Sequence, residues 1–168
     1  KASHSGDLFE YEENNRGEEK ITDKIPYFVC IPTTSGTGSE VGRSAIIADD
    51  HTKEKKILFS PHLLAKVVFA DPELTLSLPP EITAATGMGA LTHHIEAYVA
   101  KGYHPMCDGI ALEGIRLIKE NIIKATHQPD LESRGHMMIA SLMGAVAFQK
   151  GLGVIHSTAH PLSTMYNI

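Results

Sequence analysis

The chain has 168 residues, of which 42% are hydrophobic and 21% charged, and its formal net charge is −5. This balance is typical of a globular protein rather than a disordered one, and it argues against the basic face of a nucleic-acid-binding protein. No apolar run approaches the length of a membrane span, so we expect no membrane partner. Two cysteines, Cys30 and Cys107, cannot build a disulfide framework. We therefore expect a reducing compartment, the cytoplasm.

The first half of the chain is predicted to be rich in strands. Residues 1–24 are polar and charged, and we expect a loop that adds little to a core. The apolar run at residues 25–32, bounded by prolines, predicts a short buried strand. Further strands are predicted at residues 44–48, from Ile57, and at the short apolar run 67–70.

A loop rich in glycine, serine and threonine follows the first predicted strand directly. It reads P-T-T-S-G-T-G-S-E at residues 32–40. Glycine lets the backbone approach a ligand closely, and the hydroxyl groups add hydrogen-bond donors. A strand followed by such a loop is a recurrent way to bind a nucleotide. We favour a nucleotide or phosphate loop over the alternative, an ordinary tight turn.

The second half is predicted to be helical. A proline pair at residues 79–80 suits a helix start. Apolar residues then recur at helical spacing through residues 110–118 and 137–148, with the methionines of the second run in the core. Gly151 and Gly153 mark the break before a last helix. The change in composition predicts a domain boundary near Leu78.

Two histidines on that last helix, His156 and His160, lie four residues apart in G-L-G-V-I-H-S-T-A-H-P-L. Residues at this spacing share one face of a helix, so both imidazoles can point at one centre. Together with His93 and His94 upstream, the pair suggests a metal site. The alternative is a chance spacing in a chain with ten histidines. A metal site and a nucleotide loop in one chain indicate redox chemistry on a small molecule.

Taken together, five motifs resemble the iron-containing alcohol dehydrogenase family, over a stretch from about Gly6 to Asn167. They are P-T-T-S-G-T-G-S-E-V, D-P-E-L-T, L-P-P-E-I-T-A-A-T-G-M, A-L-T-H-H-I-E-A-Y and G-L-G-V-I-H-S-T-A-H-P-L, in this order. The resemblance implies an α/β plus all-α fold. Residues 1–78 would be the C-terminal part of a Rossmann-like nucleotide-binding domain, and residues 79–168 the first part of a helical metal-binding domain.

The resemblance also implies roles for individual residues. His93 and His156 match metal ligands, and His160 matches a catalytic histidine that faces the nicotinamide and the substrate. Contacts to the cofactor are implied for Thr33, Thr34, Thr37, Ser44 and Lys56. The family's aspartate ligand is replaced by Gly89. The remaining ligand, a histidine in a P-H-G segment, would follow Asn167, and the family's phosphate loop would precede Lys1, so we expect an internal fragment.

These implied roles predict an NAD- or NADP-dependent oxidoreductase that interconverts a small alcohol and its aldehyde or ketone. Fe(II) or Zn(II) would assist, held weakly because Gly89 supplies no carboxylate. We expect the protein to form a homo-oligomer. Two alternatives stay open, a metal-independent reductase of the same fold, similar to maleylacetate reductase, and a non-catalytic folded fragment.

Three finer expectations concern the neighbours of these residues. His94 is expected to pack or cap rather than bind metal. Glu96 is expected to lie too far along its helix to replace the missing carboxylate at position 89. Pro161 is expected to end or kink the last helix and turn His160 toward the cleft.

Overall fold

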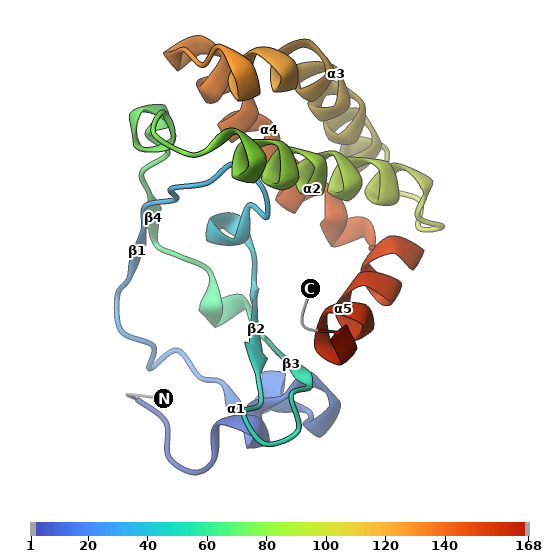
Figure 1. Cartoon of the computed structure of the whole chain (residues 1–168). Coiled ribbons are helices and arrows are strands. Elements are labelled where there is room, and N and C mark those ends of the chain that lie inside the picture. The colour runs from blue at the N-terminus through green and yellow to red at the C-terminus, as the bar shows by residue number, and fades with distance from the viewer. Residues whose placement is uncertain (1–2, 167–168) are drawn as a thin grey trace.

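The computed structural model describes residues 3–166, shown in Figure 1. Lys1 and Ala2, at the start of the first predicted domain, and Asn167 and Ile168, at the end of the second, lie outside the described residues. Three helices form a bundle: α2 (Pro80–Val99), α3 (Pro105–His127) and α4 (Leu131–Ala147). A shorter helix, α5 (Val154–Tyr166), lies below this bundle (Figure 1).

Four short strands make up two separate sheets. β1 (Val29–Cys30) pairs with β4 (Val67–Val68) in parallel. β2 (Ser44–Ala48) pairs with β3 (Lys55–Phe59) as an antiparallel hairpin, with Ser44 opposite Phe59. β2 has the predicted bounds, whereas β1 and β4 occupy only two residues of the apolar runs that predicted them.

The expectation that the first strand is buried is wrong for this chain. Val29 is 43% exposed and its neighbour Ile31 is 56% exposed. Parallel strands are normally covered on both faces, but within residues 3–166 the only strand paired with β1 is β4. The apolar sequence of the strand is therefore not matched by burial here.

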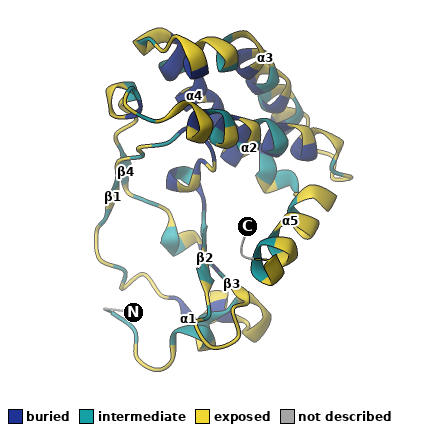
Figure 2. Ribbon diagram, in the orientation of Figure 1, coloured by how far each residue is buried: buried dark blue, intermediate teal, exposed yellow. Residues whose placement is uncertain are grey.

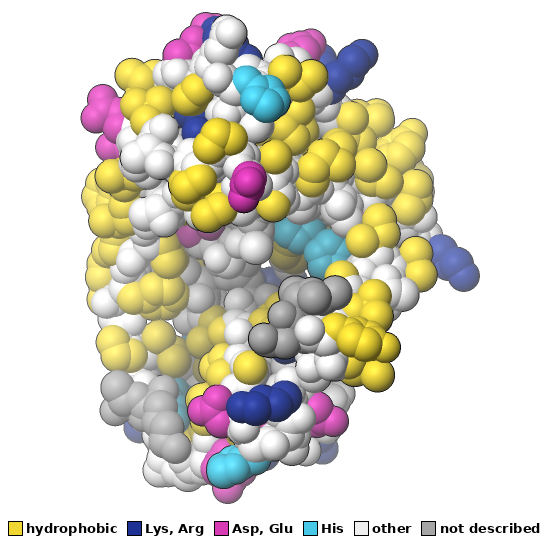
Figure 3. Space-filling view, in the orientation of Figure 1, with side chains coloured by type: hydrophobic (Ala, Val, Ile, Leu, Met, Phe, Trp, Pro, Cys, Tyr) yellow, Lys and Arg dark blue, Asp and Glu magenta, His cyan; other side chains and the backbone are white. Residues whose placement is uncertain are grey.

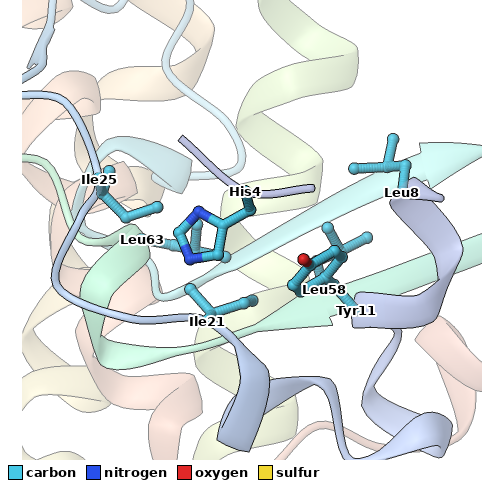
Figure 4. Close-up of a pocket in the computed structure, with 7 residues that line it drawn as sticks. All are labelled: His4, Leu8, Tyr11, Ile21, Ile25, Leu58 and Leu63. Atoms are coloured by element: carbon cyan, nitrogen blue, oxygen red, sulfur yellow. The ribbon is translucent and has the colours of Figure 1, made fainter. Parts of the chain in front are cut away.

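The N-terminal segment contributes more packing than its polar composition predicts. It forms 3₁₀ turns at Leu8–Tyr11 and Glu13–Asn15 and the short helix α1 (Gly17–Lys20). Ile21, next in the chain, is only 6% exposed. Figure 4 shows the apolar pocket that the segment closes against β3, with a volume of about 50 Å³. Its lining residues are His4, Leu8, Tyr11, Ile21, Ile25, Leu58 and Leu63.

Small side chains let the three long helices approach closely. Their buried contacts are rich in alanine. Figure 2 shows the buried residues of the bundle in dark blue, on its inner faces. Larger side chains fill the centre of the core, and Met137 and Met138 are each 1% exposed, as predicted for core methionines. α2 begins with Pro80, and α4 begins with a capping box between Asp130 and Ser133.

Among the described residues, no single helix has the length and apolar composition needed to cross a membrane. α4 and α5 meet that criterion only as a pair, bent by 105° at the break between them.

Candidate active site

The loop at residues 32–40 packs tightly against the helical bundle. A Cβ on Gly36 would lie 2.9 Å from the Cβ of Thr86 on α2. Gly38 has a φ of +60°, and a Cβ there would lie 2.6 Å from the Cβ of Ala145 on α4. Gly38 is thus required both by its left-handed backbone and by this close approach. The loop joins the strand-rich half to the helices.

The three threonines of this loop keep hydroxyl groups at or near the surface. Thr33 and Thr37 are exposed, and Thr34 is half-buried. Thr37 Oγ1 accepts a hydrogen bond from the Ser39 N–H at 3.3 Å. The contact of these threonines with a cofactor stays a prediction, and the exposure of the loop is compatible with it.

The other two residues predicted to bind the cofactor lie on the β2–β3 hairpin. Ser44 opens β2 and is half-buried. Lys56 Nζ lies 3.2 Å from an oxygen of Glu54 and 3.8 Å from one of Glu12. The hydrogen bond to Glu54 and the charge of Glu12 raise the pKa of Lys56. Lys56 can therefore bind a phosphate only when its ammonium group leaves these two carboxylates.

The histidines predicted to be functional meet where α2 faces α5. The rings of His93 and His156 stack with their centroids 4.8 Å apart and an interplanar angle of 17°. His160 lies edge-on to His156, with a centroid separation of 6.0 Å. The structure thus brings together three residues whose positions span residues 93–160. Figure 3 shows histidine side chains at a hollow below the helical bundle.

Burial keeps His93 neutral. Its side chain is almost fully enclosed, and its Nδ1 has no hydrogen-bond partner among the described residues. Burial, helped by the nearby His156 and His94, lowers the pKa of His93 to about 4. At neutral pH this imidazole therefore has lone pairs to offer a ligand.

His160 is half-buried and faces the strand-rich half. Burial, with the charges of Lys55 and His156, lowers its pKa. The same lysine donates a hydrogen bond to Ser163 Oγ at 3.1 Å, which ties β3 to α5. Pro161 was expected to end or kink the helix; it does not end it, because α5 continues to Tyr166, and a kink at Pro161 stays a prediction. The backbone bias before a proline is a preference, and helices with an internal proline are its known exception.

Glu96 was expected to lie too far from the missing carboxylate to replace it, and the structure shows it engaged elsewhere. Its side chain is 3% exposed, and Oε2 pairs with Nδ1 of His156. Burial alone disfavours its charged form, but the hydrogen bonds from His156 and the Ile155 N–H outweigh burial and lower the pKa of Glu96. The three-residue spacing of His93 and Glu96 places both on one face of α2, which was the sequence signal that Glu96 lies near the histidines.

His94 packs, as predicted, and does not join the histidine cluster. It is fully buried, and its Nε2 lies 2.8 Å from the carbonyl oxygen of Ala140 on α4. The ring also lies against Gly114 of α3, where any Cβ would overlap it. His94 is therefore a structural link among α2, α3 and α4.

The described residues do not fit a closed metal site. No group of three or more histidine, cysteine, aspartate or glutamate side chains is arranged to hold an ion within residues 3–166. His93 and His156 stack face to face rather than converge, and one nitrogen of His156 is taken by Glu96. Gly89 adds no ligand, although a Cβ there would meet nothing within 4 Å. A closed site usually needs three or four ligands.

The fold and the site define a class of protein with a strand-rich part and a helical part. A glycine-containing loop packs the first part against the second, and histidines lie where the two parts meet. Two family models match the chain. The model for the iron-containing alcohol dehydrogenases matches residues 2–72, and that for the C-terminal part of the same family matches residues 83–168. The chain belongs to the iron-containing alcohol dehydrogenase family, which confirms the resemblance and the α/β plus all-α fold class.

Individual relatives agree with this assignment. The 4-hydroxybutyrate dehydrogenase of Cupriavidus necator is 49% identical over 162 residues, which are 96% of this chain and 42% of that protein. A solved 1,3-propanediol oxidoreductase is 40% identical with a TM-score of 0.92, over 99% of this chain and 43% of that one. The sulfoacetaldehyde reductase of Bifidobacterium kashiwanohense, solved with NAD+, is 32% identical with a TM-score of 0.89, over 98% and 44%. The chain thus spans less than half the length of these relatives.

Proposed function

We propose that the chain serves an NAD(P)-linked oxidoreductase that interconverts a small primary alcohol and its aldehyde. The observation that carries this proposal is the cluster of His93, His156 and His160 where the helices meet the strand-rich half. The relatives support it, since 4-hydroxybutyrate and 1,3-propanediol both carry a primary alcohol. NAD as cofactor is supported by the bound NAD+ of the sulfoacetaldehyde reductase.

Oxidation of the alcohol requires two transfers. The carbon gives a hydride to the nicotinamide ring, and the hydroxyl gives up its proton. We assign His160, the partly accessible imidazole of the cluster, as the acceptor of the hydroxyl proton. Thr33, Thr34 and Thr37 would orient the cofactor through their hydroxyl groups, with Ser44 and Lys56 as further contacts from the hairpin.

A second candidate, a metal-independent reductase of the same fold, is favoured by one observation. Gly89 supplies no carboxylate as a metal ligand, and the carboxylate that does lie beside the imidazoles, Glu96, is paired with Nδ1 of His156. In this alternative the same two rings hold the substrate oxygen by hydrogen bonds. Dialysis against a chelator distinguishes the two candidates, because only metal-assisted turnover is lost.

The test uses the full-length gene product that contains these residues, with NAD+ or NADP+ and either 1,3-propanediol or 4-hydroxybutyrate. His160→Ala is expected to lower kcat by about 10²-fold or more, the usual contribution of a positioned proton acceptor. His127→Ala, at an exposed histidine at the end of α3, is the control. Full turnover by His160→Ala, or none by the wild-type protein with any of these substrates, contradicts the proposal.

A further inference from the structure

The carboxylate of Glu96 makes contacts on two sides at once. From α2 it reaches the first turn of α5, where Oε1 accepts the N–H of Ile155 at 2.7 Å and lies 3.4 Å from the N–H of His156. Its second oxygen, Oε2, pairs with Nδ1 of the His156 ring. Both oxygens of one buried carboxylate are therefore in use as acceptors.

Gly153, the residue before α5, leaves room for this carboxylate because it has no side chain. A Cβ on Gly153 would lie 3.1 Å from Glu96 Oε1, tighter than an ordinary van der Waals contact. The N–H groups in the first turn of a helix have no partner within the helix, so an acceptor there stabilises the start of α5. Glu96 supplies that acceptor from a different helix, 59 residues before Ile155.

We propose that Glu96 is the positioning residue for His156, fixing the ring with its proton on Nδ1 and its Nε2 free. A carboxylate can only accept, so the imidazole nitrogen facing it has to carry a proton. The hydrogen bond made by one ring nitrogen decides which nitrogen remains available for chemistry. Nε2 is left as the acceptor, on a ring that stacks on His93 and lies beside His160.

This contact gives His156 a defined orientation even without a metal. Carboxylates behind a histidine commonly orient the ring in functional sites. The use of Nε2 on a substrate oxygen or an ion rests on the proposed function. The orientation of the ring does not, and it can be measured in an inactive protein.

Glutamine at position 96 tests the assignment because it keeps the size and loses one acceptor. The N–H groups of Ile155 and His156 face one oxygen of Glu96, so the amide is expected to place its carbonyl oxygen there. Its NH2 group then faces Nδ1 of His156 as a donor, and Nδ1 can accept from it only without a proton. A purely structural role at the start of α5 survives in this variant, whereas control of the ring does not. Glu81→Gln, at an exposed glutamate in the first turn of α2, is the matched control.

The measurement is the protonation pattern of the His156 ring, by NMR of the chelator-treated full-length protein labelled with nitrogen isotope in histidine. His156→Ala assigns the signal. The wild-type protein and Glu81→Gln are expected to carry the proton on Nδ1 with Nε2 unprotonated. In Glu96→Gln this signature is expected to be lost, with the proton free to move to Nε2.

Either of two outcomes with the wild-type protein and Glu96→Gln overturns the proposal. One is a wild-type ring with its only proton on Nε2, and the other is an unchanged Nδ1–H signature in Glu96→Gln. If Glu96→Gln does not fold, Gly153→Ala takes its place, since its Cβ crowds Oε1 and should shift the Nδ1 signal. An unshifted signal there also overturns it. An Nδ1–H signature in a protein without dehydrogenase activity contradicts the proposed function and leaves this inference standing.

Discussion

Adjacent histidines on α2 have different surroundings, although both are buried. The His94 ring is held by the carbonyl of Ala140 and by the surface of Gly114. The His93 ring lies between Phe148 and His156. The Nδ1 atoms of both rings are buried without a hydrogen-bond partner among the described residues, which is costly. Of the two, His93 is the one that stacks on His156, so its Nδ1 is the one placed to meet a ligand beside that ring.

A carboxylate introduced at position 89 tests whether this site can bind a metal ion. Gly89 lies one helical turn before His93, and a side chain there meets open space. In the full-length protein, Gly89→Asp is expected to raise iron or zinc content by about an order of magnitude or more, because it adds an anionic ligand to the histidines. Elemental analysis of the purified protein measures this. Gly109→Asp, at an open and exposed site on α3, is the control, and equal metal content in all three proteins contradicts the prediction.

At the scale of elements, the helical bundle depends on glycine where α3 crosses α2. The His94 ring occupies the space that a side chain at Gly114 needs. Because His94 is fully buried and hydrogen-bonded to α4, the ring cannot swing into solvent. Close packing of this kind tolerates no added volume without a shift of the helices.

Gly114→Ala is therefore expected to destabilise the fold by about 2–3 kcal/mol, as overpacking of a core does. Gly109→Ala lies on the same helix, and its added Cβ meets nothing within 4 Å. It is expected to stabilise the protein by about 0.5–1 kcal/mol, because alanine loses less backbone entropy in a helix. Urea unfolding of both variants in the full-length protein provides the comparison. Equal stability of the two variants contradicts the role given to Gly114.

At the scale of the whole molecule, much apolar surface remains exposed. Large exposed side chains occur on both halves and include Tyr27, Phe69, Tyr103, Met106, Val154 and Met165. Extended apolar surface usually marks an interaction face. The homo-oligomer expected from the sequence stays a prediction, and the chain spans 42% of the length of its relative from Cupriavidus necator.

The purified 168-residue chain is expected to self-associate and to show no NAD-linked turnover of short alcohols. Its exposed apolar side chains drive the association, and its described residues assemble no closed metal site. Sedimentation velocity over a range of concentrations measures the first expectation, and reduced-nicotinamide absorbance the second. A monodisperse monomer, or measurable turnover, contradicts the respective half of the prediction.

The family, the helical elements and the grouping of His93, His156 and His160 were all predicted from the sequence. The helical elements and the pairing of His156 with His160 depend on patterns local in the chain, whereas His93 was grouped with them through the family resemblance. Helical periodicity, the prolines before α2 and the four-residue spacing of His156 and His160 are each contained within a short segment. The bounds of β2 followed from the same kind of local pattern.

Only the tertiary structure decided which polar groups in the site meet. Glu96 reaches His156 across 60 positions, and His94 reaches Ala140 across 46. No local pattern encodes such contacts, because they depend on how α2, α4 and α5 pack. The same holds for the exposure of β1, whose apolar residues predict burial while the strand finds only β4 beside it among the described residues. Periodicity predicts which face of an element is apolar, and packing determines what covers that face.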